Sequence, residues 1–315
     1  MLKDALIYLS GSPTARRFVR SAPGARSMAR RFVAGDTIED GIVATRALNK
    51  QNMKVTLDYL GESVNSREEA KHAADVYVQM IDRIAAEKLD ANVSLKLTQM
   101  GQDIDTAFLR ENIGRVLDRA KAADMFVRFD MEGSTHTQKT LDFFRSLWGE
   151  GYRNIGPVIQ AYLRRSKGDI EQLNAEKVRV RLCKGAYKEP ASVAFQDKAD
   201  VDRNYVELMQ MLLADGNYPG IATHDPAMIR ATRTFAKERG IDSSRYEFQM
   251  LYGVRRDLQH QLVRDGYRMR VYVPFGEAWY PYLMRRMAER PANLFFIMNA
   301  VLRESPLRVF MRRER

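Results

Sequence analysis

From residue 53 onward, short apolar runs alternate with longer amphipathic segments along the chain. The apolar runs are rich in β-branched or aromatic residues, which is typical of buried strands. They occupy residues 53–60, 91–98, 125–131, 157–163, 177–184, 220–224, 245–251 and 269–275. The segments between them carry apolar residues at helical spacing, and one of them starts with a capping box formed by Ser66 and Glu69. Eight strand-then-helix units in strict order predict an α/β fold, a (β/α)8 barrel of the TIM type.

An open, doubly wound parallel sheet is the alternative arrangement of such units. That fold usually has a glycine-rich first turn, and neither GxGxxG nor GxxxxGK[ST] occurs in the chain. Residues 1–50 precede the first strand and are predicted to form a basic, helical N-terminal arm outside the barrel. No linker or internal repeat divides the remainder, so the barrel and its C-terminal helix are expected to occupy residues 51–315.

The formal net charge of the chain is +11, and most of this excess lies at its two ends. Residues 1–31 hold seven lysines and arginines against one aspartate, and residues 303–315 hold five arginines against two glutamates. Such ends suit an anionic membrane surface as well as they suit nucleic acid. Because no zinc-finger, RNA-recognition or cold-shock pattern accompanies the charge, nucleic-acid binding is not expected, while peripheral membrane contact stays open.

The apolar runs also bear on the location of the protein. None approaches the roughly 18 residues that span a bilayer, and the N-terminal MLKDALIYLSGS has too short an apolar core for a secretory signal. We therefore expect a cytoplasmic protein, with attachment to the inner face of the cell membrane left open. A single cysteine, Cys183, excludes an intramolecular disulfide and a thiolate zinc cluster. No metal site is expected, because the strand-end His224 has neither a second histidine nor a carboxylate cluster beside it.

Polar residues gather where such a barrel builds its active site, at the carboxyl ends of the strands. In the second strand, alternation places Ser94, Lys96 and Thr98 on one side and directs Lys96 toward the barrel axis. A lysine in that position requires a negative partner, either a ligand carboxylate or a protein carboxylate, and Asp130, at the end of the third strand, is the expected protein partner. The alternative is a lysine that reaches out to water from the strand end.

Later strands end in further polar groups. In the fifth strand, Arg181 and Lys184 come just before Gly185, and a lysine next to glycine can hold a phosphate or the electron-rich edge of a cofactor. A ring of polar strand ends is completed by Gln160, Thr223, His224 and Gln249.

The segment YPYLMRRMAERPAN, residues 280–293, has an unusual helical face. Tyr282, Arg285, Arg286 and Glu289 follow the spacing at which helices normally present apolar residues to a core. Either this face is solvated, or the two arginines point into a cavity and hold an anion.

These strand ends, in this order, resemble the proline dehydrogenase family, the FAD-dependent enzymes that oxidise L-proline to Δ1-pyrroline-5-carboxylate. The matching segments are VSLKLT, RFDMEGS, VIQAY, RLCKGAY, ATH, EFQMLYG, RVYVPFG and YLMRRMAERPAN. The chain is similar in length to monofunctional bacterial members. The resemblance further implies that the helix after the eighth strand lies over the barrel mouth and that electrons pass to a membrane quinone.

The resemblance also implies roles for individual residues. Lys96, Arg285 and Arg286 match the clamp for the substrate carboxylate. Asp130 and Arg181 match the catalytic pair, in which the aspartate orients the clamp lysine and the arginine lies against the flavin near N5. The wall around the pyrrolidine ring is matched by Leu251, Tyr272 and Tyr282. The flavin contacts are matched by Met131, Gln160, Lys184, Gly185, Ala186, Thr223 and His224.

Two further positions refine this assignment. Glu62 matches an acidic gate residue that pairs with an arginine, here Arg285, over bound substrate. A tyrosine at the position of Tyr272 favours proline over hydroxyproline. Two other functions stay open on the residues alone: a barrel enzyme for a phosphorylated substrate held by Lys184 and Gly185, and a non-catalytic binding protein that keeps the fold.

Overall fold

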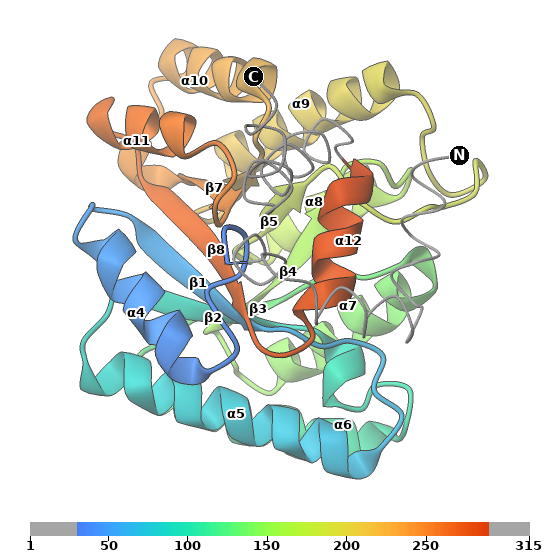
Figure 1. Ribbon diagram of the computed structural model, residues 1–315. Coiled ribbons are helices and arrows are strands. Elements are labelled where there is room, and N and C mark those ends of the chain that lie inside the picture. Colours follow the sequence, from blue (N-terminus) through green and yellow to red (C-terminus); the bar gives the residue numbers. More distant parts are fainter. Residues whose placement is uncertain (1–29, 290–315) are drawn as a thin grey trace, which may run out of the picture.

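The computed structural model describes residues 30–289, with side chains up to residue 284. Its centre is a closed barrel in which every strand pairs in parallel with the next and β8 pairs with β1 (Figure 1). The strands are β1 (Lys54–Tyr59), β2 (Ala91–Leu95), β3 (Val127–Phe129), β4 (Ile155–Gln160), β5 (Arg181–Cys183), β6 (Gly220–Ala222), β7 (Glu247–Leu251) and β8 (Met269–Phe275). The predicted (β/α)8 barrel is confirmed.

From β1 onward, a helix follows each strand, as the periodicity predicts, and among residues 30–289 one further helix precedes β1. They are α4 (Ile38–Asn49), α5 (Arg67–Ala86), α6 (Thr106–Ala122), α7 (Ser134–Gly149), α8 (Ser166–Ala175), α9 (Lys198–Asp215), α10 (Pro226–Glu238), α11 (Arg256–Arg264) and α12 (Trp279–Glu289). Short 3-10 helices span Leu97–Met100 and Ser243–Arg245. Ser66 caps α5, because its side chain accepts a hydrogen bond from the Glu69 amide. This is one half of the predicted capping box; α5 lacks the reciprocal bond from the Ser66 amide to the Glu69 side chain. No helix in residues 30–289 is long and apolar enough to cross a membrane.

Several strands are shorter than the apolar runs that predict them. The run at residues 125–131 contains only the three-residue β3, although Met125 and Met131 at its two ends are buried. Val178 and Val180 are likewise buried ahead of β5. Burial in a barrel thus extends past the ends of the hydrogen-bonded ladder, so an apolar run marks where a strand lies better than where it stops.

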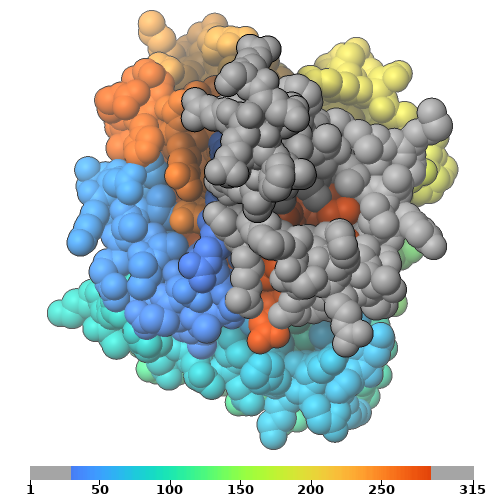
Figure 2. Space-filling view, viewed as in Figure 1, coloured from blue at the N-terminus to red at the C-terminus, as the bar shows by residue number. Residues whose placement is uncertain are grey.

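The helix α4 belongs to the wall of the barrel. It contacts β1, β8 and α5, and its Ile42 and Leu48 pack in the main hydrophobic core. In the space-filling view, the blue surface of α4 adjoins the cyan surface of α5 (Figure 2). The predicted helical arm of residues 1–50 therefore includes, at its C-terminal end, a helix that closes the barrel wall, while residues 1–29 lie outside the described part.

The helix α12 follows β8 in sequence but does not pack on the outer wall of the barrel. Trp279, Tyr280 and Leu283 form a small cluster with Phe32 and Leu60, separate from the main core. Figure 1 shows α12 in front of the strands and inside the ring of outer helices. This placement agrees with the expected eighth helix over the barrel mouth, and α4 occupies the vacated wall next to β8 and β1.

Candidate active site

The interior of the barrel is unusually polar. Every second residue of a strand faces the outer helices, as Val55 and Leu57 do in β1, and the residues between them face the barrel axis. In this barrel the axial positions carry hydrogen-bonded acids, bases and amides rather than layers of aliphatic residues. They include Asp58, Ser94, Asp130, Arg181, Glu247, Gln249, Arg270 and Tyr272.

Asp130 is the centre of the cluster at the carboxyl ends of the strands. Its Oδ1 accepts hydrogen bonds from Ser94 Oγ at 2.6 Å and Arg181 Nη1 at 2.8 Å, and its Oδ2 accepts one from the Tyr272 hydroxyl at 2.6 Å. Burial favours the neutral acid, but the charges of Arg181 and Lys96 outweigh it and lower the pKa of Asp130. The carboxylate is therefore ionised at neutral pH and holds three groups from three different strands.

Lys96 points into the same cluster, as the strand alternation predicts. Its Nζ donates to Asp58 Oδ1 at 3.2 Å and lies 3.7 Å from Asp130 Oδ2. Burial favours the neutral amine, but the charges of Asp58 and Asp130 prevail and raise the pKa of Lys96. The expected partner, Asp130, is thus present, although Asp58 is the nearer one.

Asp58 was not among the predicted site residues. It lies in β1 within the predicted run at residues 53–60, where alternation places Thr56 and Asp58 on the side opposite Val55 and Leu57. The alternation that finds Lys96 in the second strand would have found Asp58 in the first. Burial raises the pKa of Asp58, against the opposing charge of Lys96.

Arg181 is oriented by a series of hydrogen-bonded side chains in the barrel interior. Its Nε donates to Gln249 Oε1 at 2.6 Å, and Gln249 Nε2 in turn donates to Glu247 Oε1 at 2.6 Å. The same oxygen accepts from Arg270 Nε at 2.6 Å. The Arg181 guanidinium also stands over the Tyr272 ring, 5.2 Å from its centroid. The hydrogen bonds to Asp130 and Gln249 together fix the orientation of the Arg181 guanidinium.

Two other predicted residues occupy the ends of β4 and β6. Gln160 donates through Nε2 to the Met131 carbonyl at 3.2 Å, and its buried Oε1 has no hydrogen-bond partner among the described residues. His224 Nε2 accepts a hydrogen bond from the Leu251 amide at 2.9 Å. This contact requires an unprotonated Nε2, so a neutral His224 carries its proton on Nδ1.

The segment after β5 is arranged differently from the expectation for Lys184. Its ammonium forms ion pairs with Asp202 of α9 and with Asp225, at 2.8 Å, which caps α10. The charge is therefore directed to the helices, and the assignment of Lys184 to a cofactor stays a prediction. Gly185 has a φ of +104°, and a Cβ there would lie 2.1 Å from the Tyr162 ring, so only glycine fits. Ala186, next along the chain, is exposed.

Thr98, predicted to lie beside Lys96 in the second strand, is not part of that strand. β2 ends at Leu95, and Thr98 lies in the following 3-10 helix, where its Oγ1 donates to Glu132 at 2.7 Å. The predicted placement of Thr98 in a continuous strand beside Lys96 was wrong, because the chain leaves the ladder first. Glu132 is buried, and this burial raises the pKa of its carboxyl.

The remaining predicted residues lie at or near the mouth. Tyr272 belongs to the Asp130 cluster, Leu251 is half-buried at the end of β7, and Tyr282 is buried on α12. Glu62 is half-buried in the loop after β1. The side chains of Arg285 and Arg286 lie outside the described residues, so their clamp and the pairing with Glu62 stay predictions.

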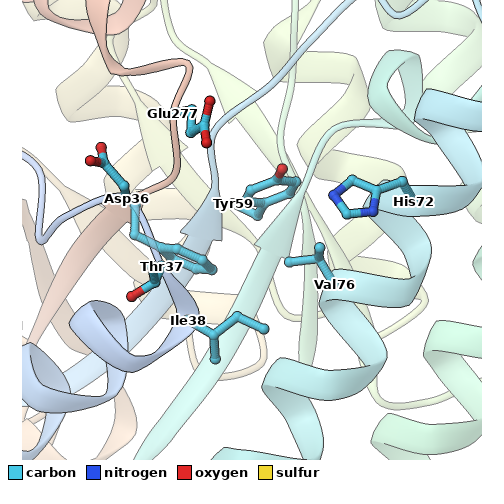
Figure 3. Close-up of a pocket in the computed structure, with 8 residues that line it drawn as sticks. Asp36, Thr37, Ile38, Tyr59, His72, Val76 and Glu277 are labelled. Atoms are coloured by element: carbon cyan, nitrogen blue, oxygen red, sulfur yellow. The ribbon is translucent and has the colours of Figure 1, made fainter.

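A separate pocket of about 440 Å³ lies outside the strand ring, between α4, α5 and the segment after β8 (Figure 3). Tyr59, His72 and Glu277 are among the residues that line it. The Tyr59 ring packs against Phe275 and His72, with centroids 5.6 and 6.4 Å apart. Because Tyr59 points away from the barrel axis and Asp58 points toward it, this pocket is distinct from the Asp130 cluster.

A closed parallel barrel with cations and carboxylates gathered at the carboxyl ends of its strands defines the class of (β/α)8-barrel enzymes. Within that class, the family model described as proline dehydrogenase matches residues 42–299. The chain belongs to the proline dehydrogenase family, as the resemblance of its strand ends implies.

Individual relatives agree with this membership. The chain is 43% identical over 304 residues to proline dehydrogenase 1 of Bacillus subtilis subsp. natto, covering 96% of this chain and 100% of the relative. It is 43% identical over 309 residues to a proline dehydrogenase of Deinococcus radiodurans, covering 96% and 98% of the two chains. Among solved structures, proline utilization A from Bdellovibrio bacteriovorus, inactivated by N-propargylglycine, superposes with a TM-score of 0.78 at 29% identity. That match covers 84% of this chain and 32% of the other.

Proposed function

We propose that this protein oxidises L-proline to Δ1-pyrroline-5-carboxylate, with FAD as the hydride acceptor and a quinone as the final electron acceptor. The observation that carries the proposal is the pairing of Lys96 and Arg181 around Asp130 at the barrel mouth, in a chain that belongs to the proline dehydrogenase family. These three charged residues form the centre of the site that the family resemblance assigns to substrate and flavin.

Lys96 is the described residue best suited to the substrate carboxylate. Its ammonium stays protonated, and its side chain is only 13% exposed, so a carboxylate that reaches it forms a charge-assisted hydrogen bond in a partly dry site. We assign Arg285 and Arg286 to the same carboxylate. Leu251, Tyr272 and Tyr282 would then pack around the pyrrolidine ring, with Glu62 as the gate.

The described strand ends fit a flavin in the chemistry of their donors. Arg181, Thr223 and His224 can donate hydrogen bonds, and the buried Gln160 Oε1 is an acceptor without a partner among the described residues. We assign the flavin to these residues together with the main chain of Gly185–Ala186, the side chain of Met131 and Lys184. When bound, FAD supplies the electron sink that accepts the hydride.

The chain itself supplies position and charge. Oxidation removes a hydride from proline C5 and a proton from the ring nitrogen, leaving a C=N double bond. The lone pair of a neutral ring nitrogen assists the departure of the hydride, so the bound amine must be unprotonated. Lys96 would fix the carboxylate, and Arg181 is pre-oriented by Asp130 and Gln249, so the reacting carbon would be held in one place.

The absorbance spectrum of the purified protein tests this function. We expect a yellow protein with a flavin spectrum that bleaches when L-proline is added without oxygen. Hydroxyproline should bleach it more slowly, because Tyr272 occupies the space beside the ring. A colourless protein that neither takes up added FAD nor oxidises proline would overturn the proposal and favour an enzyme for a phosphorylated substrate.

The transfer of electrons to a membrane quinone suggests contact with the bilayer. We propose that the basic ends, residues 1–31 and 303–315, hold the protein against an anionic membrane surface. Sedimentation with liposomes that contain anionic lipid should remove the protein from solution at low salt and release it at high salt. Equal sedimentation with neutral liposomes, or none with either kind, would refute this electrostatic attachment.

A further inference from the structure

Lys96 lies between two buried carboxylates that are not equivalent. Asp130 accepts hydrogen bonds from Ser94, Arg181 and Tyr272, so both of its oxygens are already occupied. Asp58 is 1% exposed, and its one ion pair among the described residues is with Lys96. A buried carboxylate without a cation is costly, so Asp58 depends on Lys96 far more than Asp130 does.

The strand register explains why Asp58 and Lys96 meet. Asp58 of β1 is the parallel partner of Ser94 in β2, and Lys96 lies two residues beyond Ser94 on the same side. The Nζ of Lys96 reaches back to Asp58 Oδ1 at 3.2 Å, against 3.7 Å to Asp130 Oδ2. The shorter contact is a hydrogen bond, and the longer one is a charge interaction without a hydrogen bond.

We propose that Asp58 is the positioning residue for Lys96, whereas Asp130 positions Arg181 and Tyr272. The two carboxylates then have separate tasks: Asp58 acts on the group that binds the substrate carboxylate, and Asp130 acts on the group beside the flavin. This inference rests on the proposed function, and it assigns to Asp58 the orientation of the lysine that the family resemblance gives to Asp130.

A pair of double-mutant cycles separates these tasks. Asp58→Asn and Asp130→Asn are each combined with Lys96→Met, and each variant is assayed for the KM and kcat of proline oxidation. The binding of tetrahydrofuran-2-carboxylate, which keeps the proline carboxylate but has no ring nitrogen to oxidise, is measured by calorimetry. Asp169→Asn serves as the matched control, because Asp169 of α8 is a buried carboxylate that pairs with Arg165, the residue before α8, outside the ring of strands.

We expect Asp58→Asn to raise the KM for proline and the Kd of the analogue by about tenfold, the scale of one hydrogen bond to a charged group, with kcat changed far less. In the Lys96→Met background, the same substitution should have no further effect on binding. Asp130→Asn should instead lower kcat, and that loss should persist without Lys96. An Asp58→Asn effect that is as large in the Lys96→Met background would overturn the proposal.

Thermal unfolding keeps the test decisive if a single variant folds poorly. Lys96→Met leaves the buried Asp58 carboxylate without a cation, and Asp58→Asn removes the nearer of the two carboxylates that offset the Lys96 charge. Each change should therefore lower Tm, and the double variant should recover part of the loss. Additive losses of Tm would refute the pairing even without an activity measurement. A wild-type protein that neither oxidises proline nor binds the analogue would refute the proposed function instead. The Tm values of the two single variants and the double variant would still test whether Asp58 and Lys96 are paired.

Discussion

Replacement of Asp130 with alanine is expected to lower the free energy of unfolding by about 3–5 kcal/mol, the usual cost of leaving a buried charge without its partner. The Arg181 side chain is only 7% exposed and would lose the carboxylate 2.8 Å from its Nη1. The hydroxyls of Ser94 and Tyr272 would lose their acceptor as well. Urea unfolding at neutral pH measures the change.

Two controls isolate the contribution of the charge. Asp130→Asn keeps the shape of the side chain, removes its charge and replaces one of its two acceptor oxygens with an NH2 donor, so most of the loss should remain. Asp169→Asn breaks an ion pair whose arginine is 38% exposed, and it should cost about 1 kcal/mol or less. If Asp130→Ala stayed within about 1 kcal/mol of the wild type, Asp130 would not be the group that compensates the buried Arg181 charge.

The direction of the Asp130 pKa shift determines how the stabilisation from the Asp130 charge changes with pH. The pKa of Asp130 in the folded protein lies below its usual value of 3.8, so ionisation of Asp130 stabilises the fold at every pH above that value. As the pH falls below about 4 and through the lowered pKa, the stabilisation disappears. The gap in stability between the wild type and Asp130→Asn should therefore be constant near neutral pH and narrow in acid.

The barrel could be predicted because its signal is repeated. Each buried parallel strand needs an apolar run, and each crossover needs an amphipathic helix, so an error in one unit leaves the others intact. The boundaries were less accurate at β3 and β5, where buried residues continue beyond the paired ones. The role of α4 could not be predicted, because a helix that closes the wall and a helix that stands apart can have the same amphipathic pattern.

Site residues could be predicted where the pattern within one strand was sufficient to orient the side chain. Alternation within the second strand suffices to direct Lys96 inward. The contacts of Arg181 with Gln249 and of Asp130 with Tyr272 depend on how the barrel closes, because these partners lie 68 and 142 positions apart in the sequence. The same limit applies to Lys184, whose carboxylate partners come from α9 and α10 and are not marked by the residues around it.

Replacement of Lys96 with methionine should raise the KM for proline by roughly 10- to 150-fold, which corresponds to the loss of about 1.5–3 kcal/mol from a hydrogen bond between charged groups. The methionine keeps much of the apolar stem and cannot bind a carboxylate. The Kd of tetrahydrofuran-2-carboxylate should rise by a similar factor, which excludes an effect confined to the chemical step. An unchanged Kd would show that the substrate carboxylate binds elsewhere.

The conservative variant Lys96→Arg separates charge from shape. Arginine keeps the positive charge that offsets Asp58 and Asp130, so this variant should be more stable than Lys96→Met. Its planar, longer fork does not reproduce the compact ammonium that reaches Asp58 Oδ1, so binding of proline should recover only in part. Full recovery of stability with incomplete recovery of affinity would show that Lys96 acts through its position as well as its charge, as expected for a lysine that Asp58 holds in place.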